Sequence, residues 1–144
     1  MQTETTNSTA LFKIDKSQIS KAFNKHFFDF LDDILSIYPE CKEIQSAKRS
    51  FETFRQLNPA SIAKVWNAFI FIPYKYEILQ GDVDFFVNKD YSADLAGKTK
   101  NTDNIMEKID NVREFVSTMS PENKAHTAKY ILNLSRLSEA YCSE

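Results

Sequence analysis

The stretch NPASIAKVWNAFIFIP, residues 58–73, contains both the start signal and the stop signal of a helix. Asn58 is an N-cap candidate, and Pro59 fits the first helical position, where its missing N–H costs nothing. The apolar residues that follow recur at steps of three and four, which is typical of a buried helical face. They are Ile62, Val65, Trp66, Phe69 and Ile70. Pro73 then either kinks one long helix over 59–80 or begins a new short one.

The same apolar spacing recurs on both sides of this segment. It predicts further helices near residues 18–38, 41–57, 103–119 and 121–142. Pro39 should close the first helix, Gly81 should be a left-handed C-cap, and Ser120 followed by Pro121 should start the last helix. Only two glycines leave few tight turns, which disfavours a β-rich fold. The expected fold class is all-α, a single-domain helical bundle or orthogonal array of four to six helices.

The length of 144 residues fits a single domain with a core of its own. Residues 1–17 begin with a polar stretch that has no apolar periodicity, and we expect a flexible N-terminal tail there. Residues 18–144 should form the helical domain. Within it, residues 88–102 have the polar, turn-forming composition of an exposed and mobile loop.

Charge and composition exclude several classes of function. The net charge of −2 gives no positive field that would attract a phosphate backbone, so no nucleic-acid partner is expected. No apolar run reaches the roughly 20 residues of a membrane span. The N-terminus MQTETTNSTA lacks the basic and apolar regions of a signal peptide, and the expected location is cytoplasmic. Cys41 and Cys142 are isolated, which indicates reduced thiols and not a metal or redox motif.

The acidic segment GDVDFFVNKDY, residues 81–91, raises the question of a cation site. A calcium loop needs oxygen ligands at alternating positions, with a glycine at the sixth and a glutamate at the twelfth, and most of this pattern is absent. Asp82 and Asp84 are better interpreted as the cap and first turn of a short helix that carries Phe85 and Phe86.

A second polar cluster is possible on the first helix, where His26, Asp29 and Asp33 could share one edge. Its ordinary interpretation is a solvated polar face. No nucleophile motif, phosphate-binding glycine loop or zinc spacing occurs in the chain. The sequence therefore predicts no catalytic, cofactor-binding or metal-binding residue. The alternative function is a small cation-dependent enzyme or regulator that uses this acidic and histidine cluster or the pair Asp82 and Asp84.

Aromatic residues make up 13% of the chain, more than the exposed faces of helices ordinarily carry. The segment FIFIPYKY is apolar on more than one face, which suggests burial against a partner in addition to the core, and the longer segment VWNAFIFIPYKY should supply part of a contact surface. We expect a non-enzymatic module that binds a protein partner or forms a homo-oligomer. The expected contact residues are Trp66, Phe69, Phe71, Tyr74, Tyr76, Phe85 and Phe86.

Three segments carry a resemblance to a known group of proteins. They are FFDFLDDILSIYPE (27–40), LNPASIAKVWNAFIFIPYKYEILQGDVDFFVNKDYS (57–92) and KAHTAKYILNLSRLSEAY (124–141). Together they resemble small helical proteins of unassigned function encoded by nucleocytoplasmic large DNA viruses, including relatives of the mimiviruses and the algal viruses. The resemblance implies a minor virion component or an intracellular viral factor, located in the host cytoplasm or the virion. It implies no active site that could be carried over.

Overall fold

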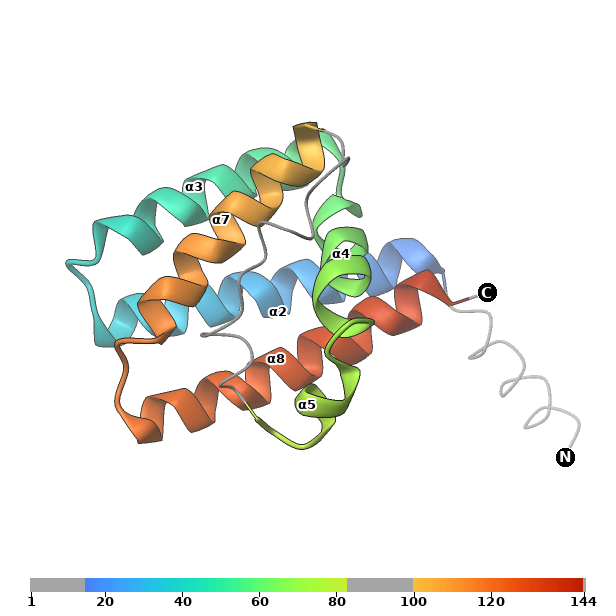
Figure 1. The fold of residues 1–144 in the computed structure, drawn as a ribbon. Coiled ribbons are helices and arrows are strands. Elements are labelled where there is room, and N and C mark those ends of the chain that lie inside the picture. Colours follow the sequence, from blue (N-terminus) through green and yellow to red (C-terminus); the bar gives the residue numbers. More distant parts are fainter. Residues whose placement is uncertain (1–14, 83–99, 144) are drawn as a thin grey trace, which may run out of the picture.

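The computed structural model describes residues 15–82 and 100–143, and the side chains of all of these except 100–103. Every regular element within these ranges is a helix, so the all-α prediction is confirmed for this part of the chain (Figure 1). The elements are α2 (Lys16–Ile37), α3 (Lys42–Leu57), α4 (Ser61–Trp66), the π-helical turn η1 (Asn67–Phe71), α5 (Lys75–Leu79), α7 (Lys100–Val116) and α8 (Pro121–Cys142).

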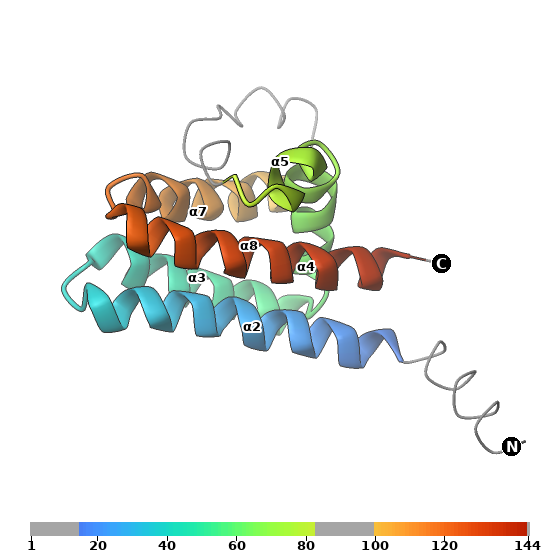
Figure 2. The same ribbon diagram turned by 90° about the horizontal axis from the view of Figure 1, so that it is seen from below.

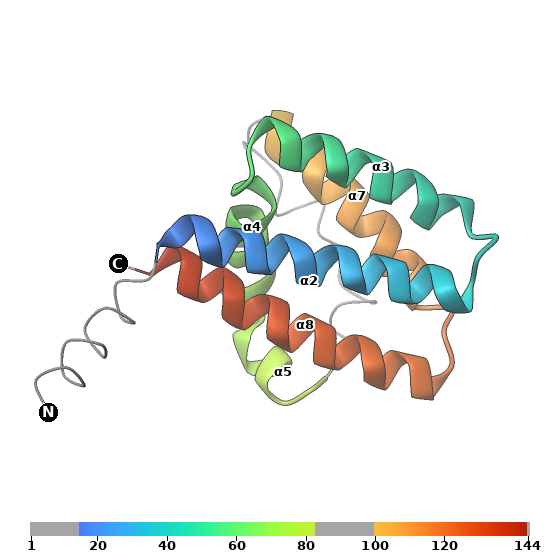
Figure 3. The same cartoon turned by 180° about the vertical axis from the view of Figure 1, so that it is seen from behind.

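The four long helices form a bundle, and α4 crosses it near one end (Figure 1). Helix α2 packs along α8 in the opposite direction, and α3 packs mainly on α7. Views from below and from behind show α2 and α8 side by side along most of their length (Figures 2 and 3). Helix α5 also contacts α8. The architecture is therefore a bundle with one crossing helix. It combines features of the two predicted alternatives, a helical bundle and an orthogonal array.

The ends of the long helices follow the predicted signals closely. Asp15 accepts a hydrogen bond from the Ser17 N–H (3.0 Å), so α2 begins at Lys16, two residues before the predicted start. Helix α8 has the predicted bounds, and the Ser120 Oγ accepts from the Asn123 N–H (3.2 Å). Helix α2 ends at Ile37, just before Pro39.

Helix α7 lies three residues earlier than predicted at both ends. Its first residues, 100–102, are polar and were expected to belong to the loop 88–102. The first turn of a helix does not need apolar residues, so polar composition does not locate its start. The rest of that loop, 88–99, lies outside the described residues, as do 1–14 of the expected tail.

The segment quoted first does not form one continuous helix. The Asn58 Oδ1 accepts from the Ala60 N–H (3.1 Å) in a local turn, which delays the start of α4 to Ser61. Further on, the Ile72 N–H donates to the Asn67 carbonyl (3.0 Å), the longer bond of a π-turn. Pro73 has no N–H to continue the helix, and α5 begins anew at Lys75. Of the two predicted alternatives, the new short helix is correct.

Gly81 is the predicted left-handed C-cap. Its φ of 75° is a conformation that favours glycine. The Gly81 N–H donates to the Ile78 carbonyl (3.1 Å), and the Asp82 N–H donates to the Glu77 carbonyl (3.0 Å). These two bonds are the Schellman pattern that closes a helix. The predicted short helix with Asp84, Phe85 and Phe86 lies outside the described residues.

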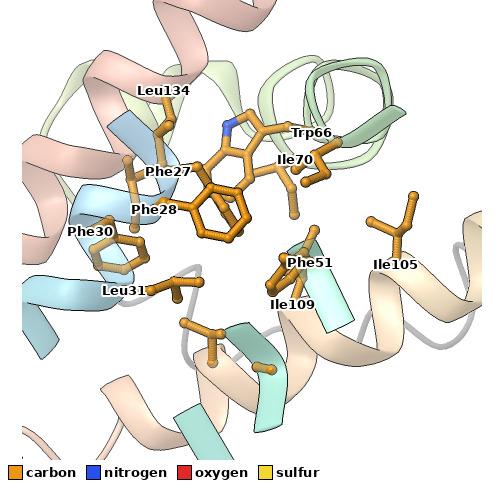
Figure 4. Packing of buried hydrophobic residues seen from close by; sticks show 14 of the residues in the cluster. Phe27, Phe28, Phe30, Leu31, Phe51, Trp66, Ile70, Ile105, Ile109 and Leu134 are labelled. Atoms are coloured by element: carbon orange, nitrogen blue, oxygen red, sulfur yellow. The ribbon is translucent and has the colours of Figure 1, made fainter. Parts of the chain in front are cut away.

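The core is rich in aromatic rings and centres on Trp66 (Figure 4). Trp66 is 1% exposed, and its ring lies edge-on to those of Phe23 (6.3 Å) and Phe27 (6.2 Å). The Trp66 Nε1–H donates to the Oγ of Ser135, which is itself fully buried (2.9 Å). One indole thus connects the crossing helix α4 to both α2 and α8.

Candidate functional site

The structure describes five of the seven predicted contact residues, and they differ in burial. Trp66 and Phe71 are buried, at 1% and 2% exposure, so they belong to the core and present no surface to a partner. Phe69 and Tyr74 are half-buried and pack against the core. Tyr76 is 74% exposed. Phe85 and Phe86 lie outside the described residues.

Tyr76 does not stand alone on the surface. Leu79, one turn further along α5, is 49% exposed, and Ile72, in the turn before α5, is 63% exposed. Tyr76 and Leu79 are three positions apart in α5 and so lie on one side of that helix; Ile72 precedes α5 in the chain, in the turn that contains Pro73. We call the exposed side chains of Ile72, Tyr76 and Leu79 the α5 patch. The sequence prediction missed Ile72 and Leu79 because it weighted aromatic residues, although their spacing relative to Tyr76 was visible.

The α5 patch is attached to the bundle by other residues of the same short helix. Ile78 is buried, at 2% exposure. Lys75 pairs with Glu139 of α8 (3.7 Å), and its ammonium also lies over the Phe71 ring (5.6 Å). Ile78 and Lys75 thus anchor α5 to the rest of the fold.

A hollow of about 240 Å³ adjoins the α5 patch, and Ile72 contributes to its wall. The other lining residues are Asn67, Phe71, Lys75, Glu139, Cys142 and Ser143. The Asn67 Oδ1 is buried and has no hydrogen-bond partner among the described residues. The hollow gives the flat apolar patch an indented edge with polar groups, as is common at protein interfaces.

The second candidate cluster, His26 with Asp29 and Asp33, is only partly brought together. His26 and Asp29 line a groove of about 470 Å³ between α2 and α8. Asp33 lines a separate, much smaller hollow. Across residues 15–82 and 100–143, no group of three or more His, Cys, Asp or Glu side chains is arranged to hold a metal ion.

The ring of His26 lies against that of Tyr130 on α8, with 4.9 Å between their centroids. Burial is the main cause that lowers the pKa of His26, with a smaller opposing effect from Asp29. Burial likewise raises the pKa of Tyr130, reinforced by the charges of Asp33 and Asp29. The contact between α2 and α8 thus favours a neutral imidazole and a neutral phenol.

The His26 environment predicts a pH dependence of stability. In the folded protein the pKa of His26 lies below its usual value of 6.5. The imidazole of the unfolded chain is therefore protonated first as the pH falls. The free energy of unfolding should therefore decrease from pH 6.5 down to the pKa of folded His26. Urea unfolding at pH 7.5 and 5.5 checks this. His26→Gln should weaken this dependence of stability on pH, and a dependence as steep in His26→Gln as in the wild type would contradict the prediction.

Comparisons with known proteins give no relative for this arrangement. No family model, curated protein or solved structure matches the chain. The resemblance to proteins of large DNA viruses stays a prediction. Among the helices of residues 15–82 and 100–143, none has the length and apolar character needed to cross a bilayer.

Proposed function

We propose that the protein is a non-enzymatic interaction module that binds a protein partner through the α5 patch. The observation that carries the proposal is the exposure of Ile72, Tyr76 and Leu79 on one short segment, which Ile78 and Lys75 anchor to the rest of the fold. Clustered apolar side chains on a small soluble domain tend to be interfaces, because isolated exposure is common and clustering is not.

The surroundings of the patch support a contact of moderate size. Its centre is a tyrosine, a residue type enriched among the side chains that dominate binding energy. Lys75 and Glu139 line the same hollow as Ile72, and their side chains are 56% and 50% exposed, so charged groups lie at one edge of the apolar residues. The partner therefore needs a complementary apolar surface with polar groups at its edge.

The proposal extends to the kind of protein that binds the α5 patch. The resemblance to proteins of large DNA viruses supports a partner that belongs to a virus particle or to an infected cell. A second copy of this chain is the other occupant to consider, since the same patch on two molecules can form a closed two-fold contact.

The test compares wild type with the triple variant Ile72→Ser, Tyr76→Ser, Leu79→Ser. Light scattering of the purified proteins over a wide concentration range measures self-association, and capture from the native source followed by mass spectrometry identifies other partners. The wild type should either self-associate or retain a specific protein, and the triple variant should lose that behaviour while its circular dichroism spectrum stays helical.

Leu57→Ser provides the matched control. Leu57 is another exposed apolar side chain (77%), at the end of α3 and away from α5 (Figure 1). This variant should behave as wild type in both measurements. Equal behaviour of wild type and triple variant would contradict the proposal, and loss of binding in Leu57→Ser would show that the contact lies elsewhere.

A further inference from the structure

The groove between α2 and α8 has a geometry of its own, separate from the α5 patch. Its α2 wall is formed by Ala22, Lys25, His26 and Asp29, at steps of three and four along one helical face. Its α8 wall is formed by Asn133, Arg136 and Leu137. The two helices run side by side in opposite directions (Figure 3), and side chains of both line the groove.

The size of the groove matches a small molecule. Its volume is about 470 Å³, within the roughly 300–1,000 Å³ range of small-molecule sites in proteins. Ala22 contributes a small apolar side chain to the lining. Leu137 packs on the core and gives the groove an apolar surface.

The charges of the groove favour an anion. Lys25 already pairs with Asp29 (3.0 Å), so the charge of that carboxylate is compensated. Arg136 has no ion-pair partner among the described residues. With a neutral His26, one positive charge is left without a counter-charge in the lining. A metal cation, as considered from the sequence for His26 and Asp29, would be repelled by Arg136 and would compete with Lys25 for its ligand.

We propose that this groove binds a small organic monoanion, a carboxylate attached to an apolar group. The Arg136 guanidinium matches a carboxylate with paired hydrogen bonds. Ala22 and Leu137 contact the apolar part, and the Asn133 amide lies beside them as a further hydrogen-bonding group. This activity goes beyond the proposed interaction function and does not depend on it, because none of the groove residues belongs to the α5 patch.

The experiment uses two probes of equal shape and opposite charge, benzoate and benzamidine, with the ¹⁵N-labelled protein in NMR titrations. Benzoate should shift the amide signals of Ala22, Asn133 and Leu137 in a saturable way, and benzamidine should not. Arg136→Gln should weaken benzoate binding about tenfold, the effect of removing one charged hydrogen-bonding partner.

Lys129→Gln is the control, since it removes the same charge from an exposed residue of α8 that does not line the groove. It should leave the affinity for benzoate unchanged. Three results would overturn the proposal: no saturable shift with benzoate, equal shifts with benzamidine, or an Arg136→Gln variant that binds benzoate as well as the wild type does. Loss of the α5 patch should not alter benzoate binding, so this test and that of the proposed function can fail separately.

Discussion

Replacing Trp66 with alanine is expected to lower the free energy of unfolding by about 3–5 kcal/mol, the typical cost of removing a large buried aromatic side chain. Trp66 fills the space between α4, α2 and α8, and its ring contacts Phe23 and Phe27. Its removal leaves a cavity where the crossing helix packs against α2 and α8. It also leaves the buried Ser135 hydroxyl without its indole donor.

Urea unfolding followed by circular dichroism measures the loss. Lys64→Ala is the matched control, because Lys64 is exposed on the same helix; its effect should stay within about 0.5 kcal/mol, as for ordinary surface substitutions. Ser135→Ala should cost less than Trp66→Ala, about 1–3 kcal/mol, because the ring stays while its N–H loses a partner. A Trp66→Ala variant as stable as the Lys64 control would show that α4 does not pack as described.

The second large effect concerns binding. Tyr76→Ala should weaken the complex with the captured partner by about 2 kcal/mol, or roughly 30-fold in Kd, the size expected for a central tyrosine of an interface. The side chain is 74% exposed in the free protein, so its truncation should leave the stability of the fold nearly unchanged. Loss of affinity without loss of stability would distinguish a contact residue from a core residue.

Isothermal titration of the purified partner gives this affinity. If the patch contacts a second copy of the chain, dilution experiments give the dimer dissociation constant instead. Leu57→Ala serves as control and should bind as wild type. An unchanged affinity for Tyr76→Ala would remove the tyrosine from the interface, and a loss of helicity in that variant would place it in the fold.

Much of the fold follows from local signals in the sequence. The cap at Ser120, the proline at 121, and the proline at 39 act within one turn of the chain, and the helix ends lie where those residues predict them. Gly81 closes α5 as predicted, because a single residue with a positive φ is a local requirement. The apolar spacing in residues 58–73 likewise marked residues that the structure buries, among them Ile62, Val65, Trp66 and Ile70.

The remaining features depend on contacts between distant parts of the chain. The π-turn at Asn67–Phe71 directly follows Trp66, whose indole N–H donates to Ser135, 69 residues away in sequence. The split of the aromatic segment into core and surface has the same origin. Trp66 is buried by contacts with α2 and α8, and η1, which contains Phe71, packs on α8, whereas Tyr76 of α5 is 74% exposed. A pattern of apolar residues in a single segment does not say which of its faces another helix will cover.

The groove between α2 and α8 could not be predicted from the sequence either. His26 and Asp29 were recognised as a cluster, but Arg136, Asn133 and Leu137 come from a helix about 100 residues later. Because these α8 residues line the same groove, the proposed ligand is an anion and not a cation. Arg136 adds a positive charge to a cluster that, in the sequence, contained only carboxylates and a histidine.

Hydrogen exchange of the complex tests the central claim, that the α5 patch is the contact surface, most directly. Helix α5 has only five residues, so its amides should exchange readily in the free protein. Binding of the partner is predicted to slow exchange in the peptide that covers residues 72–82 and to leave the end of α3, around Leu57, unchanged. Unchanged exchange across 72–82 together with protection at another surface would contradict the claim.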